Sequence, residues 1–148
     1  MTESIWNTPF TVEMANRYGE NTANATLGIE ITEAGPDYLR GRMPVDHRTK
    51  QPAGILHGGA SVLLAETLAS WGGNFVVDAT KYSVVGQEIN ANHLRPATGG
   101  WVIGTARPVH IGRRSQVWEI RIEGEDGKLV CISRMTLAVI DRPVPKRD

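Results

Sequence analysis

The chain has 148 residues, which fit one domain and leave little room for two. Its 16 basic and 16 acidic residues cancel, so no overall field draws it to nucleic acid or to an anionic membrane. The longest uncharged stretch, residues 51–65, is shorter than the roughly 20 apolar residues of a membrane span, and residues 1–10 lack the pattern of a signal peptide. The single cysteine, Cys131, lies in an apolar run and predicts a buried thiol in a reducing compartment, the cytoplasm.

The N-terminal third predicts a short helix followed by two strands. Residues 8–19 favour the helix, and residues 27–34 and 38–45 favour the strands. Gly35-Pro36-Asp37 separates the two strands and is typical of a turn. A polar loop follows over residues 46–52.

One long helix is expected, over residues 58–77. The segment is rich in Ala and Leu, and large apolar side chains recur at helical spacing, at Leu64, Leu68, Trp71 and Phe75. The pair Gly72-Gly73 weakens this pattern near the end, because glycine is a poor helix former.

The second half of the chain predicts strands, over residues 82–95, 101–111, 116–123 and 128–140. In the third of these, Trp118, Ile120 and Ile122 alternate with charged residues, which predicts one buried and one exposed face. Asp126-Gly127 favours a tight turn before the last strand.

A helix this apolar must be covered on most sides, and a curved antiparallel sheet would cover it. The sequence therefore predicts an α+β fold, in which about six strands wrap a long central helix. Residues 1–140 form a single domain in this interpretation, and residues 141–148 form a charged tail that frays.

Glu66 is the only residue with a formal charge between Lys50 and Asp78. If the helix is covered on most sides, an unpaired carboxylate there is desolvated and becomes a candidate base or nucleophile. Helical spacing equally allows a solvated face made of Glu66, Thr67, Ser70 and Asn74. The pattern alone leaves both interpretations open.

His57-Gly58-Gly59 stands where the long helix is expected to begin. Free amides and the positive end of the helix dipole attract developing negative charge there, and glycine lets a ligand approach the backbone. The same glycines would also serve a tight turn, and His57 would also serve as a structural hydrogen-bonding residue.

Two histidines and three arginines lie in or near the expected strands: His93, Arg95, His110, Arg113 and Arg114. Together they could hold a phosphate-bearing ligand through charge-assisted hydrogen bonds, or they could be ordinary charge at strand edges and turns. A metal site is not expected, because His57, His93 and His110 include no close-spaced pair of ligands.

Three motifs resemble the hotdog-fold acyl-CoA thioesterases. Residues 51–66 read Gln-Pro-Ala-Gly-Ile-Leu-His-Gly-Gly-Ala-Ser-Val-Leu-Leu-Ala-Glu, and residues 85–95 and 108–118 carry two further motifs in the same order. The branch that they resemble contains the 1,4-dihydroxy-2-naphthoyl-CoA thioesterase of menaquinone biosynthesis and the proofreading thioesterase of the enterobactin pathway. The likeness runs from about residue 43 to residue 140 with small gaps.

The resemblance implies a hotdog fold and hydrolysis of an acyl-CoA whose acyl group is aromatic or otherwise hydrophobic. By position, the family's catalytic carboxylate falls on Glu66, and the amide that polarises the thioester carbonyl falls on Gly58. Gln51 and His57 would assist around the carbonyl and the sulfur, and Ser70 lies one helical turn after the carboxylate.

The family's coenzyme A contacts fall on Gly86, His93, Leu94, Arg95, Pro96, His110, Ile111, Gly112, Arg113, Arg114 and Ser115. Trp71 falls beside the acyl pocket and is larger than expected there, and the pair Arg113-Arg114 is more basic than usual in the family. Coenzyme A is part of the substrate, so no cofactor and no metal are implied.

The long helix also predicts self-association. Gly58 and Glu66 lie about 12 Å apart along the axis at about 1.5 Å per residue, so one thioester cannot contact both groups of one chain. Two antiparallel helices across a two-fold axis would bring each Gly58 beside the other chain's Glu66. We therefore expect a dimer, and dimers that pair would form a tetramer, a choice that the sequence leaves open.

Two other functions compete with hydrolysis. One is an acyl-thioester dehydratase or hydratase of the same fold, and the other is a non-catalytic module that binds acyl-CoA. Gln51 and Glu66 around the His57-Gly58-Gly59 motif favour hydrolysis, because a pure binding module gains nothing from a carboxylate that faces the thioester.

Overall fold

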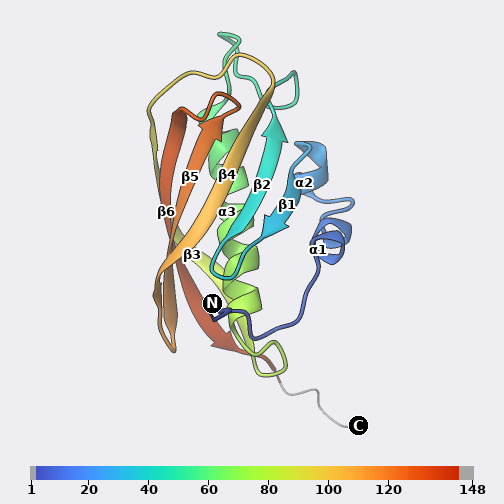
Figure 1. The fold of residues 1–148 in the computed structure, drawn as a ribbon, viewed down its shortest axis with the longest axis vertical. Helices are drawn as coiled ribbons and strands as arrows, with labels where there is room; N and C mark the ends of the chain where they lie inside the picture. The colour runs from blue at the N-terminus through green and yellow to red at the C-terminus, as the bar shows by residue number, and fades with distance from the viewer. Residues whose placement is uncertain (1–2, 144–148) are drawn as a thin grey trace.

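A computed structural model of the protein describes residues 3–143 and contains a long helix against a six-stranded antiparallel sheet (Figure 1). The elements in chain order are α1 (Val12–Tyr18), α2 (Ala23–Thr26), β1 (Glu30–Ala34), β2 (Leu39–Pro44), α3 (Gly58–Val76), β3 (Tyr82–His93), β4 (Trp101–Ile111), β5 (Ser115–Gly124) and β6 (Leu129–Asp141). The strands lie in the order β1-β2-β4-β5-β6-β3, so β1 and β3 form the two edges of the sheet. This is the α+β fold that the sequence predicts.

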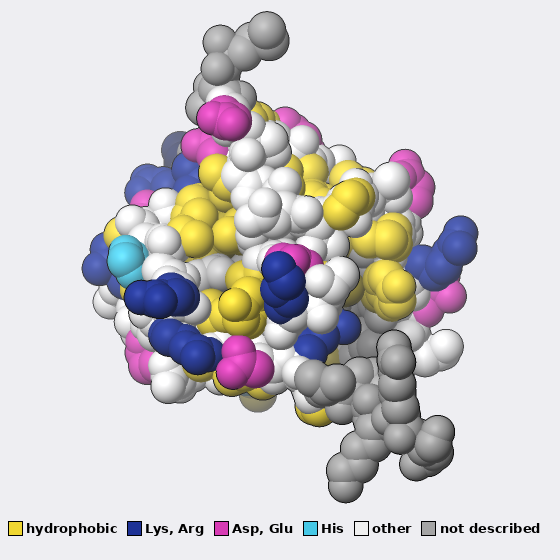
Figure 2. Space-filling model, turned by 90° about the horizontal axis from the view of Figure 1, so that it is seen from below, with side chains coloured by type: hydrophobic (Ala, Val, Ile, Leu, Met, Phe, Trp, Pro, Cys, Tyr) yellow, Lys and Arg dark blue, Asp and Glu magenta, His cyan; other side chains and the backbone are white. Residues whose placement is uncertain are grey.

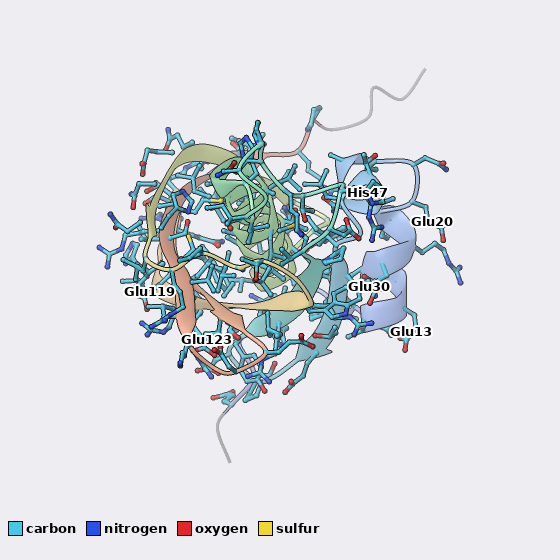
Figure 3. The ribbon with its side chains drawn as sticks, turned by 90° about the horizontal axis from the view of Figure 1, so that it is seen from above. Glu13, Glu20, Glu30, His47, Glu119 and Glu123 are labelled. Carbon is cyan, nitrogen blue, oxygen red and sulfur yellow. The ribbon has the colours of Figure 1, made fainter. Side chains whose placement is uncertain are left out.

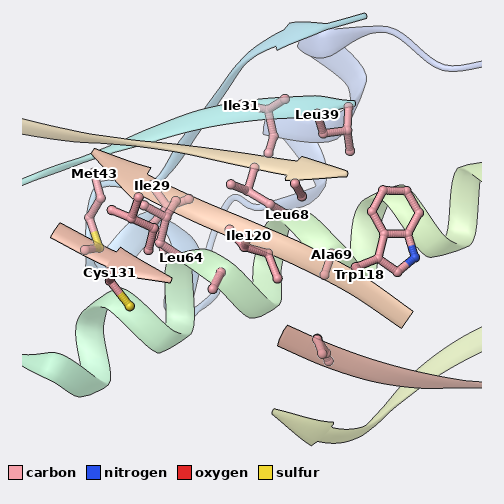
Figure 4. Close-up of a cluster of buried hydrophobic side chains, with 14 of the residues drawn as sticks. Ile29, Ile31, Leu39, Met43, Leu64, Leu68, Ala69, Trp118, Ile120 and Cys131 are labelled. Carbon is pink, nitrogen blue, oxygen red and sulfur yellow. The ribbon is translucent and has the colours of Figure 1, made fainter. Parts of the chain in front are cut away.

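Helix α3 holds the core together because its large apolar side chains meet the concave face of the sheet. Leu64 and Leu68 are fully buried, and α3 contacts β2, β3, β4, β5 and β6. In Figure 4, Leu68 lies with Ile120 of β5 and Leu39 of β2. Burial of each such side chain stabilises the fold by about 1.5–3 kcal/mol. The helix is therefore fixed relative to the sheet.

Two glycines that weaken the helical pattern have a packing role. A Cβ atom on Gly72 would lie 2.7 Å from the Trp118 ring, and one on Gly73 would lie 2.5 Å from Leu137. Both distances are shorter than real carbon contacts, so only glycine lets the end of α3 approach the sheet this closely. The indole N–H of Trp118 donates to Gln116 Oε1 over 2.8 Å, which satisfies its polar group in the core.

The N-terminal elements differ in part from those predicted. Helix α1 is shorter than the expected 8–19 and begins after Thr11, whose side-chain oxygen accepts from the Met14 N–H. The four-residue helix α2 was not expected, although Thr22 caps it in the same way. The sequence also predicts a first strand from residue 27, whereas β1 begins at Glu30.

The second half agrees closely with the prediction. Helix α3 ends one residue before the expected position, and β4 has the expected bounds. The side chains of Trp118, Ile120 and Ile122 are fully buried, as is Cys131. Of the expected tail, Asp141 belongs to β6, and residues 144–148 lie outside the described residues. No helix within residues 3–143 is long and apolar enough to cross a membrane.

Candidate active site

The start of α3 presents a free amide. His57 is the N-cap, and its Nδ1 accepts from the Gly59 N–H over 2.8 Å, which fixes the ring. The Gly58 N–H, one residue earlier, donates to no acceptor among residues 3–143. The positive end of the helix dipole lies at the same place as this N–H donor. Together they would stabilise an oxygen that gains negative charge.

A hollow of about 460 Å³ opens beside this amide. Its lining includes Gly58 and Gln51, together with the segment that ends β3, residues 93–96. The His93 ring lies directly against Gly58, because a Cβ atom there would be 2.8 Å from His93 Nε2. Gly58 and four of the eleven expected coenzyme A contacts therefore line the same hollow.

Glu66 lies in a second hollow, of about 370 Å³, lined by Asn24, Leu63, Glu66, Thr67, Ser70, Trp71 and Asn74. The expected neighbours Ser70 and Trp71 are thus in place. The Glu66 carboxylate faces Gly86 of β3, where a Cβ atom would lie 2.8 Å from Oε1. Gly86 therefore leaves the room that the carboxylate occupies.

The Glu66 side chain is exposed and makes no hydrogen bond or ion pair with any atom of residues 3–143. Of the two interpretations that the sequence allows, a solvated helix face describes the single chain. The alternative, a carboxylate desolvated by the surrounding sheet, is wrong for one chain, because Glu66 lies beside the edge strand β3 and is exposed there. Figure 3 shows the acidic residues Glu119 and Glu123 on the outer side of the sheet.

The two hollows share no lining residue. Gly58 and Glu66 are separated by about 12 Å along α3, at about 1.5 Å per residue. Each hollow of one chain therefore contains only one of the two groups to which the family resemblance gives a catalytic role, Gly58 in the first and Glu66 in the second.

The expected cluster of histidines and arginines does not form within one chain. His93 pairs with Cys131 on β6, whereas Ser115, at the start of β5, pairs with Ala138. These positions on β6 are about 23 Å apart at about 3.3 Å per residue. The segment 110–115 therefore lies at the opposite end of the sheet from His93.

The segment 110–115 forms the exposed turn between β4 and β5. The Gly112 N–H donates to the Ser115 carbonyl over 2.9 Å, and Arg114 pairs with Asp141 over 3.3 Å. Arg113 is in no ion pair among the described residues. The Arg114 guanidinium group is thus in an ion pair, whereas Arg113 is exposed to solvent.

The perturbed titrating groups lie outside both hollows. Burial raises the pKa of the Cys131 thiol, which supports its expected role as a packed core residue. Hydrogen bonds from the Arg48 side chain and backbone lower the pKa of Asp46 to about 2, within the loop that leads to α3. No group of His, Cys, Asp and Glu side chains within residues 3–143 is arranged to hold a metal ion.

Sequence reasoning missed part of the Glu66 hollow. Thr67 and Asn74 follow from helical spacing, but Asn24 comes from α2, which the pattern did not predict. The Thr67 hydroxyl donates to Asn24 Oδ1 over 3.1 Å, so this contact joins α2 to α3 at the hollow.

Comparison with known proteins supports the resemblance to thioesterases. The model of the thioesterase superfamily matches residues 53–131. A 1,4-dihydroxy-2-naphthoyl-CoA hydrolase of Escherichia coli is 48% identical over 92% of this chain and 99% of its own. The crystal structure of a thioesterase from Haemophilus influenzae has a TM-score of 0.92 at 48% identity and covers 97% of this chain and 99% of its own. A thioesterase mutant from Pseudomonas aeruginosa also has a TM-score of 0.92, at 45% identity, over 94% of this chain and 100% of its own.

Proposed function

The chain belongs to the thioesterase superfamily and is a thioester hydrolase with the hotdog fold, and from this premise we propose that it hydrolyses acyl-CoA thioesters whose acyl group is aromatic or otherwise hydrophobic. The observation that carries the proposal is that α3 presents both a Gly58 amide and a Glu66 carboxylate without hydrogen-bond partners among residues 3–143. The printed activity of the Escherichia coli relative supports an aryl thioester of coenzyme A, and makes the naphthoyl thioester of menaquinone biosynthesis a candidate substrate.

The chemistry requires few groups. The departing thiolate has an ordinary pKa of about 8.5, so it leaves with little help from an acid. The Gly58 amide and the helix dipole stabilise the oxygen of the tetrahedral intermediate. Glu66 either takes a proton from the attacking water or attacks the carbonyl carbon itself. In the first route the oxygen of water bonds to the carbonyl carbon, and the C–S bond then breaks to release the acid and the thiolate. In the second route the Glu66 carboxylate displaces the thiolate to form an anhydride, which water then hydrolyses.

The site in this proposal is shared between two chains. Strand β3 is a 12-residue edge strand, and its Val85–Glu88 segment is exposed beside Glu66. A long open edge is a ready template for pairing with a second chain. If two β3 strands pair antiparallel, their α3 helices also run antiparallel, and the amide end of each helix approaches the other's carboxylate. Gln51, His57 and Gly58 of one chain then face Glu66 and Ser70 of its partner.

The proposed arrangement also gives the expected coenzyme A contacts a role. Gly86 and the segment 93–96 lie beside the shared site, whereas the segment 110–115 lies at the far end of its own sheet. In the assembled protein, the arginines of that turn would therefore come from a different chain to bind the phosphates of the nucleotide. Pairing of dimers into a tetramer would supply them. The protein would act in the cytoplasm and without a cofactor.

A panel of thioesters tests the proposal. Benzoyl-CoA, 1,4-dihydroxy-2-naphthoyl-CoA, aliphatic acyl-CoAs and matched carrier-protein thioesters are assayed for release of free thiol. We expect thiol from the aryl-CoA and hydrophobic acyl-CoA substrates. Release from the carrier-protein thioesters alone would contradict the choice of coenzyme A. Binding without thiol release from any substrate would favour the non-catalytic module, and hydration of an enoyl-CoA without thiol release would favour the hydratase.

A further inference from the structure

A third hollow, of about 350 Å³, continues from the one that holds Glu66. It is lined by Thr8, Met14, Tyr18, Trp71, Asn74, Phe75, Ala79 and Arg142. Trp71 and Asn74 line both the Glu66 hollow and this one. The two therefore meet along α3, and we call the third hollow the distal groove.

The walls of the distal groove are mainly aromatic. Trp71 stacks on Phe75 with ring centroids 5.3 Å apart, and the Tyr18 ring lies 6.0 Å from Trp71. Phe10 stacks on the far side of Phe75 at 3.6 Å. These planar faces suit the apolar body of an acyl group.

The N-terminal segment fixes these walls to the end of α3. The Thr8 N–H donates to the Phe75 carbonyl over 2.9 Å, and its hydroxyl donates to the Val77 carbonyl over 2.7 Å. Asn16 holds α1 on β1 through two hydrogen bonds of 2.8 Å, one to each backbone polar group of Ile31. The groove is thus part of the folded structure, built from segments far apart in the sequence.

Among residues 3–143, Arg142 is the one charged side chain that lines the groove. Its backbone N–H donates to the Lys81 carbonyl over 2.8 Å, and its Nε donates to the Tyr82 carbonyl over 3.2 Å. It is in no ion pair among the described residues, because the nearby Asp78 pairs with Lys81 and Asp141 pairs with Arg114. Seen from below in Figure 2, Lys and Arg side chains lie among and beside hydrophobic ones on this end of the molecule. The groove therefore combines apolar walls with one positive charge.

We propose that the distal groove is a second acyl subsite, which takes the far end of an elongated acyl group that carries a terminal carboxylate. This inference rests on the proposed function, since it requires the thioester to lie at Glu66. From Glu66 to Asn74 is about 12 Å along α3 at about 1.5 Å per residue, so a benzoyl group ends near Trp71 and a longer acyl group reaches the groove. At that separation Glu66 opposes the binding of a second carboxylate only weakly, because the screening length in physiological salt is about 8 Å.

Two substrates of equal length test the subsite: decanoyl-CoA and the CoA monothioester of decanedioic acid, with benzoyl-CoA as a short reference. The wild-type protein should have the higher kcat/KM on the dicarboxylic monothioester. Arg142→Gln should lower the ratio of the two kcat/KM values about three- to tenfold, the range for one partly exposed charge-assisted contact. Arg142→Lys, which keeps the charge, should restore most of the ratio.

The matched control is Arg121→Gln, on the outer face of β5, which should leave the ratio unchanged. Thermal unfolding of each variant separates a local effect from loss of the fold. Hydrolysis of all three substrates with no dependence of the ratio on Arg142 would overturn the subsite and leave the proposed function standing. Failure of the wild-type protein to hydrolyse any of them, and any other acyl-CoA, would overturn both.

Discussion

Replacement of Glu66 should separate catalysis from stability. Its carboxylate lies in the hollow beside Trp71 and Ser70 and makes no hydrogen bond or ion pair within residues 3–143. Loss of a positioned base or nucleophile lowers kcat by roughly 10²–10⁴-fold, which corresponds to about 2.7–5.4 kcal/mol of transition-state stabilisation. We expect an effect in this range for Glu66→Ala and for the isosteric Glu66→Gln.

The stability of these variants should change little. An exposed side chain without partners contributes within about 0.5 kcal/mol to the free energy of unfolding, so the unfolding midpoint should stay close to that of the wild type. Free-thiol release from an aryl-CoA gives kcat, and denaturant unfolding gives stability. Glu123→Gln, on the outer side of the sheet, is the matched control. Near-normal turnover in both Glu66 variants would remove this residue from the mechanism.

Three further predictions concern the expected coenzyme A contacts, the acyl pocket and the helix–sheet packing. Joint replacement of Arg113 and Arg114 by Gln should raise KM for CoA thioesters but change it little for a pantetheine thioester that lacks the nucleotide; equal changes on both substrates would mean a structural role. Trp71→Ala should shift preference toward bulkier acyl groups across the thioester panel and cost about 1–3 kcal/mol of stability, since the ring is half-buried; an unchanged preference would place the ring outside the acyl pocket. Gly72→Ala should destabilise the fold by about 1–3 kcal/mol in denaturant unfolding, because its Cβ would meet the Trp118 ring at 2.7 Å; wild-type stability would contradict the close helix–sheet approach.

The elements that the sequence predicts best are those with strong periodicity. Leu64 and Leu68 repeat on the buried face of α3, and the alternation around Trp118 identifies the buried face of β5. Helix α2 escaped prediction because four residues are too few for any periodicity to show. The pair Gly72-Gly73 gave a misleading signal, since helix propensity says nothing of how closely a helix must approach its sheet.

The sequence likewise predicts some residues of the candidate site and not others. Glu66 and Gly58 were identified because one is an isolated charge and the other stands at a helix start, and the family motif gave both a role. The sequence could not predict that His93 and His110 lie at opposite ends of the sheet, because this separation depends on the register of the strands. Asn24 and Arg142 line hollows beside α3 but come from distant segments, so only the fold reveals them.

The central claim is that Glu66 of one chain acts with the Gly58 end of its partner, and mixing two inactive variants tests it most directly. Glu66→Ala chains and Gln51→Ala chains are unfolded together, refolded, and assayed for thiol release. Random pairing makes about half of the dimers mixed, and each mixed dimer keeps one intact site of two, so about a quarter of wild-type activity should return. If both parents are inactive and the mixture stays inactive although exchange of chains is demonstrated, the site lies within one chain and the shared architecture is wrong.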